Sequence, residues 1–236
     1  MNIASAFSVS LYSKAGGRTK NEDVGLFSSH PADETVLICV LADGQGGRPG
    51  GQAAAETACR VALEVACAYS LRQLCKSKTW GKILRAADSA VREQPEAGAT
   101  TLVALCILGD SVYGASSGDS AAVLLNVYDQ YHELSAEQLK NPPIGSGNAK
   151  IVPFSQPLLD PWLVMLASDG LWKYVGWPGV KSILQTHQIE GGKSDELTTL
   201  LVDAARSAGQ RTLSDDTTVI VVESSKVVEP SKNDNE

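Results

Sequence analysis

Aspartates in this chain stand at the ends of apolar runs, where few other charges occur. Asp43 ends the run VLICVLAD and Asp169 ends WLVMLASD, and a glycine follows each. Asp119 lies between two further apolar runs, and Asp215 precedes a last one. A single Asp-Gly pair is usually a turn whose carboxylate accepts backbone hydrogen bonds. Several carboxylates at strand ends are costly to gather unless cations neutralise them, and hard oxygen ligands suit Mg²⁺ or Mn²⁺.

Strands and helices must position these carboxylates, and the sequence predicts both. Runs with strand character lie at 7–13, 35–42, 100–108, 111–116, 120–127, 162–168 and 217–223. Helical patterns lie at 51–74, 79–93, 177–186 and 194–208. The stretch 135–160 is rich in Pro and Gly, so we predict a loop with one short strand at 150–154. Grouped strands with helices inserted early and late predict an α+β fold, an α-β-β-α sandwich of two packed, mainly antiparallel sheets flanked by helices.

Length and composition favour one compact domain. The chain has 236 residues, of which 43% are hydrophobic, enough for a sizeable core. We expect residues 1–224 to form this domain and the polar tail 225–236 to be disordered. The net charge of −7 argues against nucleic acid as a partner. The same charge would repel a phosphorylated substrate, so phosphate chemistry would need bound cations or a well-placed arginine.

Cysteine usage and hydropathy indicate the compartment. The five cysteines include no C-x-x-C pair, which indicates reduced, buried thiols. No basic leader precedes an apolar core at the N-terminus, and no run reaches the roughly 18 apolar residues of a membrane span. We therefore expect a cytoplasmic protein that does not associate with membranes, and we take a monomer as the default.

Six short motifs, taken in order, resemble those of the metal-dependent protein serine/threonine phosphatases of the 2C type. They are RTKNED at 18–23, DGQGG at 43–47, GATT at 98–101, GDS at 118–120, SDGL at 168–171 and DDTTV at 215–219. The resemblance extends over nearly the whole chain and makes residues 1–224 the catalytic domain. It implies a bacterial-type enzyme that removes phosphate from phosphoserine and phosphothreonine in proteins and opposes a cognate kinase.

The resemblance also implies metal ligands. Asp43 would bridge two ions, either Mn²⁺ or Mg²⁺, and the Gly44 carbonyl would bind one of them. Asp169 and Asp215 would complete the second ion. Asp119, together with Asp169, corresponds to a third and weaker ion position. Two cations about 4 Å apart would lower the pKa of a bridging water, supply hydroxide near neutral pH and stabilise the phosphoryl charge without a protein nucleophile.

Three residues outside the ligand set have implied roles. Glu22 and Asp23 would hold metal-bound water from the outer shell. Arg18 matches the residue that clamps the substrate phosphate, since its planar fork can bind two oxygens at once.

Three features depart from the family pattern. Gln45 stands where many members carry a histidine thought to protonate the leaving group, and glutamine is no acid. Ala121 stands where an arginine is usual. The stretch from Asp119 to Asp169 is too short for the usual flap subdomain, so we expect a short loop over 138–157 and a more open cleft.

Two other functions remain open from the sequence. One is a pseudophosphatase that binds a phosphoprotein or regulatory partner without turnover, and the other is hydrolysis of a small phosphorylated metabolite. Every predicted metal ligand is present, which favours the active protein phosphatase. The aromatic residues near Asp169 suggest core packing, although Trp172 and Tyr174 follow it closely enough to line the rim of a site.

Overall fold

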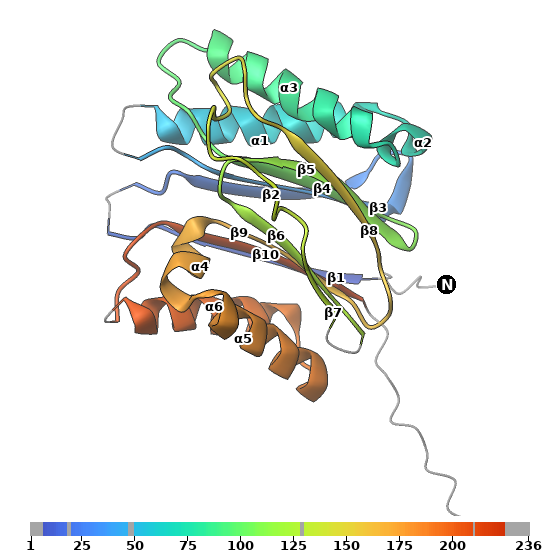
Figure 1. Ribbon diagram of the computed structural model, residues 1–236, viewed down its shortest axis with the longest axis vertical. Helices are drawn as coiled ribbons and strands as arrows, with labels where there is room; N and C mark the ends of the chain where they lie inside the picture. The colour runs from blue at the N-terminus through green and yellow to red at the C-terminus, as the bar shows by residue number, and fades with distance from the viewer. Residues whose placement is uncertain (1–6, 18–19, 47–49, 128–129, 210, 225–236) are drawn as a thin grey trace, which may run out of the picture.

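The computed structural model describes residues 7–17, 20–46, 50–127, 130–209 and 211–224. Two five-stranded sheets are stacked face to face, and helices cover the outer face of each (Figure 1). Neighbouring strands within each sheet run antiparallel. The α+β fold expected from the sequence, an α-β-β-α sandwich, is therefore confirmed.

The strand order places distant parts of the chain side by side. One sheet contains, in spatial order, β2 (Asp23–His30), β3 (Asp33–Asp43), β4 (Leu102–Leu108), β5 (Ser111–Ser117) and β8 (Val152–Pro157). The other contains β1 (Phe7–Lys14), β10 (Thr217–Ser224), β9 (Leu163–Ala167), β6 (Ala121–Asn126) and β7 (Gln130–Glu133). The last strand thus lies between the first strand and β9.

The helices form two layers, one on each sheet (Figure 1). The layer on the β2–β8 sheet consists of α1 (Gly51–Ala68), α2 (Leu71–Leu74) and α3 (Ser77–Glu93). The layer on the β1–β7 sheet consists of α4 (Asp169–Val175), α5 (Trp177–Glu190) and α6 (Ser194–Ala208). None of the described helices is both long and apolar enough to cross a membrane.

Strand β3 is buried on both of its faces. Successive side chains in a strand point to opposite faces. Val40 and Ala42 accordingly pack in the core beneath α1 and α3, whereas Leu41 packs in the core between the sheets. This double burial explains why the run that leads to Asp43 is continuously apolar. A third core lies beneath α4, α5 and α6.

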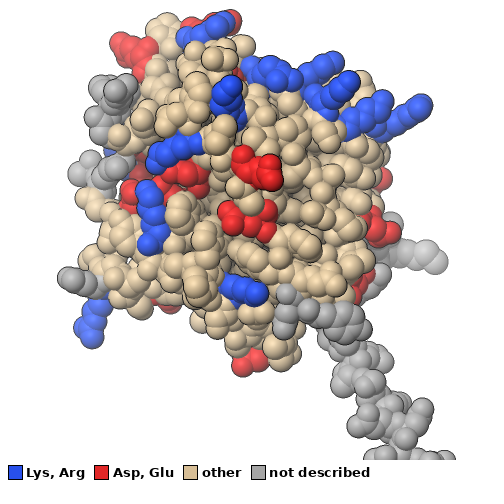
Figure 2. All heavy atoms as spheres, viewed as in Figure 1, with Lys and Arg blue, Asp and Glu red and all other residues tan. Residues whose placement is uncertain are grey.

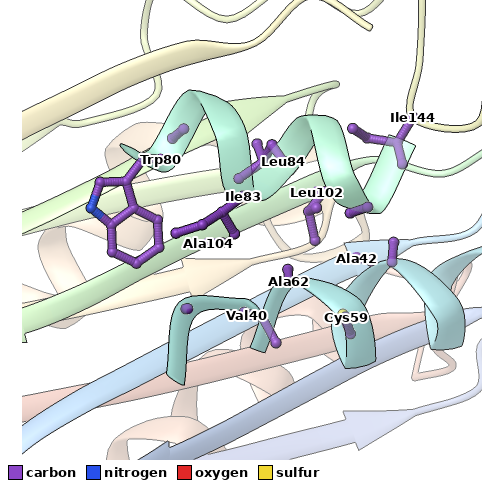
Figure 3. Packing of buried hydrophobic residues seen from close by; sticks show 14 of the residues in the cluster. Val40, Ala42, Cys59, Ala62, Trp80, Ile83, Leu84, Leu102, Ala104 and Ile144 are labelled. Atoms are coloured by element: carbon purple, nitrogen blue, oxygen red, sulfur yellow. The ribbon is translucent and has the colours of Figure 1, made fainter. Parts of the chain in front are cut away.

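Helix α3 turns its apolar side to the sheet. Trp80, Ile83 and Leu84 lie on one side of the helix, as residues three and four positions apart do, and point toward β4 (Figure 3). The fully buried Trp80 ring donates its Nε1 hydrogen to the carbonyl oxygen of Leu74 at 2.8 Å. Its polar tip is therefore satisfied within the core.

Several elements differ from the sequence-based expectation. The helix expected over 51–74 is two helices, because Tyr69 is extended and Ser70 caps a new start, its backbone N–H donating to Gln73 Oε1 at 3.0 Å. The short strand expected at 150–154 is β8, which begins and ends later. Three elements were not predicted. Polar residues interrupt the apolar pattern of the edge strand β2, and the four-residue edge strand β7 and the seven-residue α4 are short.

Two smaller expectations have mixed outcomes. All five cysteines are free, but Cys75 is exposed, so the expectation of buried thiols is wrong for this residue. Among the aromatic residues near Asp169, Trp162 belongs to the core between the sheets, whereas Tyr174 is 38% exposed. The tail expected to be disordered, 225–236, lies outside the described residues.

Candidate active site

The strand-end carboxylates meet in one cavity of about 280 Å³ at one end of the sandwich. Its wall includes all four predicted aspartates, together with two threonines and two lysines: Asp43, Asp119, Asp169, Asp215, Thr100, Thr101, Lys140 and Lys173. Gly44 also lines it. Toward the left of Figure 2, acidic side chains gather in a hollow with basic side chains above and below them.

The backbone of Asp43 is fixed by the threonines of the GATT motif. The Asp43 N–H donates to Thr101 Oγ1 at 2.8 Å, and its carbonyl oxygen accepts from the Thr101 N–H at 2.9 Å and from Thr100 Oγ1 at 2.8 Å. Thr101 Oγ1 also shares a 2.6 Å hydrogen bond with Ser120 Oγ, next to Asp119. These contacts hold the strand end without using the Asp43 carboxylate.

The acids of the RTKNED motif lie beside Asp43. Asp23 is directly opposite Asp43 in the pairing of β2 with β3. The Gly44 N–H donates to the Glu22 carbonyl oxygen at 3.1 Å, so Glu22 is held next to the same turn. Arg18 lies outside the described residues, and the structure therefore does not place it.

Asp216 is a residue whose role the sequence reasoning missed. Its Oδ1 accepts from the Gly16 N–H and its Oδ2 from the Glu22 N–H, both at 2.8 Å. One buried carboxylate thus joins the loop before β2 to the segment that carries Asp215. The adjacent pair Asp215-Asp216 was visible in the sequence, but only the structure separates a cavity-lining acid from a backbone-binding one.

The inner acids, Asp23 and Asp43, are held without a cationic partner among the described residues. Burial, together with the neighbouring charges of Asp23 and Asp169, raises the pKa of Asp43 to about 9. Burial also raises the pKa of Asp23 to about 7. Neither carboxylate oxygen of Asp23 makes a hydrogen bond within the described part of the chain, although the hydroxyls of Ser168 and Thr218 lie nearby. Like charges directly opposite each other on paired strands are destabilising.

The outer acids, Asp119 and Asp169, are each paired with a lysine. Lys140 Nζ contacts Asp119 Oδ2 at 2.5 Å. Lys173 contacts Asp169 from four residues further along α4. Burial raises the pKa of Asp169 even though Lys173 opposes that shift. Burial alone would lower the pKa of Lys173, but its hydrogen bond to Asp169 more than compensates and the pKa is raised. The Asp-x-x-x-Lys spacing in a helix is the signal that could have found this pair.

The donor set fits a divalent cation. Carboxylates and a backbone carbonyl are the hard oxygen ligands that Mg²⁺ and Mn²⁺ prefer. The raised pKa of Asp43 means that this acid holds a proton near neutral pH, which a bound cation would displace, and the oxygens of Asp23 have no hydrogen-bond partner among the described residues. As placed, the described side chains do not form a ready group of three or more His, Cys, Asp or Glu ligands. Asp119 and Asp169 contact ammonium groups instead, so an ion would exchange with a lysine there.

Solved structures share the fold. A bacterial serine phosphatase bearing a point mutation has a TM-score of 0.78 at 22% identity, over 93% of this chain and 99% of that one. Stp1 from Staphylococcus aureus, a serine/threonine phosphatase, has a TM-score of 0.77 at 19% identity, over 96% and 98%. The catalytic domain of the serine/threonine phosphatase PstP, solved with two manganese ions, has a TM-score of 0.73 at 19% identity, over 92% and 97%.

Comparison of the sequence with protein-family models identifies the family. No curated protein sequence matches the chain. The family model described as protein phosphatase 2C matches residues 14–141, which is more than half of the 236 residues. This span contains the first four motifs and ends inside the segment that carries Lys140. The chain therefore belongs to the protein phosphatase 2C family.

Proposed function

We propose that the chain hydrolyses phosphoserine and phosphothreonine in proteins with two divalent cations, Mn²⁺ or Mg²⁺. Asp43 and the Gly44 carbonyl would hold one ion. Asp43, Asp169 and Asp215 would hold the other. The observation that carries the proposal is the half-buried Asp43 carboxylate, which has four acidic neighbours and no basic partner among the described residues. The two manganese ions in the PstP structure support the same stoichiometry.

The cations, when bound, would lower the pKa of a water between them and stabilise the charge of the phosphoryl group. The protein itself must release the protons that Asp23 and Asp43 hold near neutral pH. Glu22 and Asp23 would orient water at the edge of the site. Arg18 would bind the substrate phosphate. Gln45 lines the cavity but has no acidic proton, so it can orient the leaving group without protonating it.

A third ion at Asp119 belongs to the proposal as a weaker site. Asp119 and Asp169 would provide its ligands. Lys140 now contacts Asp119, so the ion would have to displace an ammonium group. We expect this position to fill only at metal concentrations above those that fill the first two.

The proposed substrate is a phosphorylated protein from the pathway of a serine/threonine kinase. We place the chain in the cytoplasm, as a monomer whose residues 1–224 form one catalytic domain.

The segment between β7 and β8 supports an open cleft, because it is short and is bound tightly to the domain. Asp88 of α3 accepts hydrogen bonds from the backbone N–H groups of Gly145, Gly147 and Ala149 at 2.7, 3.0 and 3.2 Å.

The test is phosphate release from a phosphothreonine peptide and from a small phosphate ester, with Mn²⁺, with Mg²⁺ and with a chelator. We expect turnover that needs the metal and that is lost in Asp43→Asn and Asp169→Asn. Asp110→Asn is the matched control, because this aspartate is exposed and does not line the cavity. A folded native chain that binds the phosphopeptide but releases no phosphate with either ion would contradict the proposal.

A further inference from the structure

A second cavity, of about 180 Å³, adjoins the carboxylate cavity and shares Gly118, Asp119 and Lys140 with it. The proposed phosphoryl chemistry does not use this second cavity. Since the walls are shared, a substrate whose phosphate lies at the carboxylates would reach it within about three residues, at roughly 3.3 Å per extended residue. The cavity is therefore placed to bind a side chain that neighbours the phosphorylated residue.

One wall of the second cavity is aromatic. Trp172 of α4 and Trp177 of α5 both line it, and both are half-buried. Their rings are nearly parallel, with centroids 5.7 Å apart and an interplanar angle of 7°. The face of an indole attracts a cation that lies within about 6 Å of the ring centre. The stacked pair thus offers a rigid surface for a planar, positively charged group.

The β6–β7 hairpin contributes an acidic wall. Glu133 lines the cavity, and its exposed carboxylate makes no ion pair with any residue that the structure describes. Asp119, on the shared wall, is already paired with Lys140. Ala121 also lines the cavity, and its small side chain leaves the space open. The charge left uncompensated in the lining is therefore negative.

Two polar groups in the lining have unused hydrogen-bonding capacity. Trp172 Nε1 and Gln138 Oε1 are buried and make no hydrogen bond to the described residues. Gln138 is held in place through its other amide atom, Nε2, which donates to the Ser120 carbonyl oxygen at 2.9 Å. A buried donor or acceptor without a partner is costly, so a ligand that supplies one gains affinity. Both atoms are covered as placed, so a small shift of either side chain would be needed for a ligand to find an acceptor for an N–H at Gln138 or a donor for a carbonyl oxygen at Trp172.

We infer that this cavity binds a basic side chain of the phosphoprotein, arginine in the first place, within about three residues of the phosphorylated one. The inference rests on the proposed function, because that function places the phosphate in the neighbouring cavity. A guanidinium group can stack on the indole pair, pair with Glu133 and donate to Gln138 at once. An aliphatic side chain would leave both polar partners unused, and an acidic one would be repelled by Glu133.

The test uses phosphothreonine peptides that differ at one position, with Ala, Arg, norleucine or Glu placed up to three residues on either side. We expect one register in which Arg raises kcat/KM about tenfold over Ala, or about 1.4 kcal/mol, through KM. Glu133→Gln and Trp177→Leu should each reduce this Arg-to-Ala ratio to about threefold or less. Glu137→Gln, a nearby exposed carboxylate outside the lining, is the matched control and should keep the ratio.

Three results would overturn the inference. These are the absence of any register that favours Arg, a preference for norleucine over Arg, or an Arg preference that survives both Glu133→Gln and Trp177→Leu. A small phosphate ester tests the phosphatase separately, since it cannot reach the second cavity. If the native chain turns over neither peptide nor ester, the proposed function fails. The Arg and Ala peptides are then compared by tryptophan fluorescence titration, where equal affinities would overturn the inference.

Discussion

The inner and outer acids of the cavity differ in how their negative charge is compensated. The outer acids, Asp119 and Asp169, each contact a lysine of the chain. The inner acids, Asp23 and Asp43, face each other across β2 and β3 with no such partner among the described residues, and the pKa of each is raised by burial. The chain thus supplies its own cations at the edge of the cavity and leaves the interior to be neutralised by a proton or a metal ion.

This difference implies that the inner acids oppose folding but favour the binding of cations. Burying carboxylates that face each other opposes folding unless something neutralises them. A fold that retains such a pair, held rigidly by backbone hydrogen bonds, has a strong binding site for cations. The lysine-paired acids need no added cation to be stable in the metal-free chain, and they would exchange their lysines for an ion when metal binds.

The largest expected effect comes from removing the central inner acid. Asp43→Asn should lower kcat with saturating Mn²⁺ at least about a hundredfold, since a ligand shared by both ions is lost. The same variant should melt at a higher temperature than the native chain in a chelator near neutral pH, because Asn does not have to take up a proton on folding as Asp43 does. Phosphate release and calorimetry measure the two effects. A metal-free melting temperature that falls instead would show that the burial of the Asp43 carboxyl does not destabilise the fold.

The stability of the metal-free chain should depend on pH, and the inner acids set the direction of that dependence. Asp23 and Asp43 have pKa values of about 7 and about 9 in the folded chain, above their ordinary value of 3.8. Between about pH 4 and pH 9 the folded state therefore holds more protons than the unfolded state, and stability should fall as pH rises through this window. Mn²⁺ affinity should rise over the same window, because the ion replaces the protons.

The measurement is a series of melting curves at pH 5.5, 7.0 and 8.5, with a chelator and with saturating Mn²⁺. Asp43→Asn should flatten the metal-free pH dependence. Asp110→Asn provides the comparison, since its carboxylate is exposed and lies outside the cavity. Equal slopes in all three proteins would mean that other groups cause the pH dependence.

Asp216 represents a third way to satisfy a buried acid, through backbone N–H groups. Asp216→Ala leaves the N–H groups of Gly16 and Glu22 without their acceptor, which should cost about 1–3 kcal/mol of unfolding free energy. Mn²⁺ affinity should fall about tenfold, because Glu22 and Asp215 lose their common support. Chemical denaturation and calorimetric titration measure these changes. Asp216→Asn keeps one acceptor and should lose less on both measures.

The smallest effect is expected from the two lysines that pair with the outer acids. Lys173→Met and Lys140→Met remove ammonium groups that compete with a cation, so Mn²⁺ affinity should rise, by no more than about fivefold. Stability should change by less than about 1 kcal/mol, since partly exposed ion pairs contribute little. Lys78→Met, at an exposed position of α3, is the control. A loss of Mn²⁺ affinity in Lys173→Met would show that the lysine supports the site rather than competing for it.

The sequence could predict the fold where periodicity is strong. The continuous apolar runs of β3 and β9, which are buried on both faces, predicted strands, and Asp43 and Asp169 stand at the ends of those runs. The edge strand β2 was not recognised, because its sequence pattern does not follow burial: Leu26 and Phe27 are exposed, whereas Asp23 and His30 are buried. Asp23 was therefore assigned from its motif, whereas its position opposite Asp43 depends on a strand pairing that the sequence does not display.

The site could be predicted only in its acidic part. Lys140 carries no motif and reaches Asp119 from a segment that was predicted as a loop, whereas the spacing of Lys173 from Asp169 becomes a signal only once α4 is known to be a helix. Asp216 and Asp215 are adjacent, so spacing alone cannot show which one faces the cavity. Such assignments depend on contacts between residues far apart in the chain, and these appear only once the two sheets are packed.

The position of β10 between β1 and β9 has a consequence for synthesis on the ribosome. Strand β1 is the first described strand to emerge, yet its pairing partner is the last, and Asp215 immediately precedes that partner. A nascent chain can therefore expose most of the acidic residues for many seconds without being able to assemble them. The proposed metal site, and with it any phosphatase activity, would first form only after Asp215 and β10 have left the ribosome.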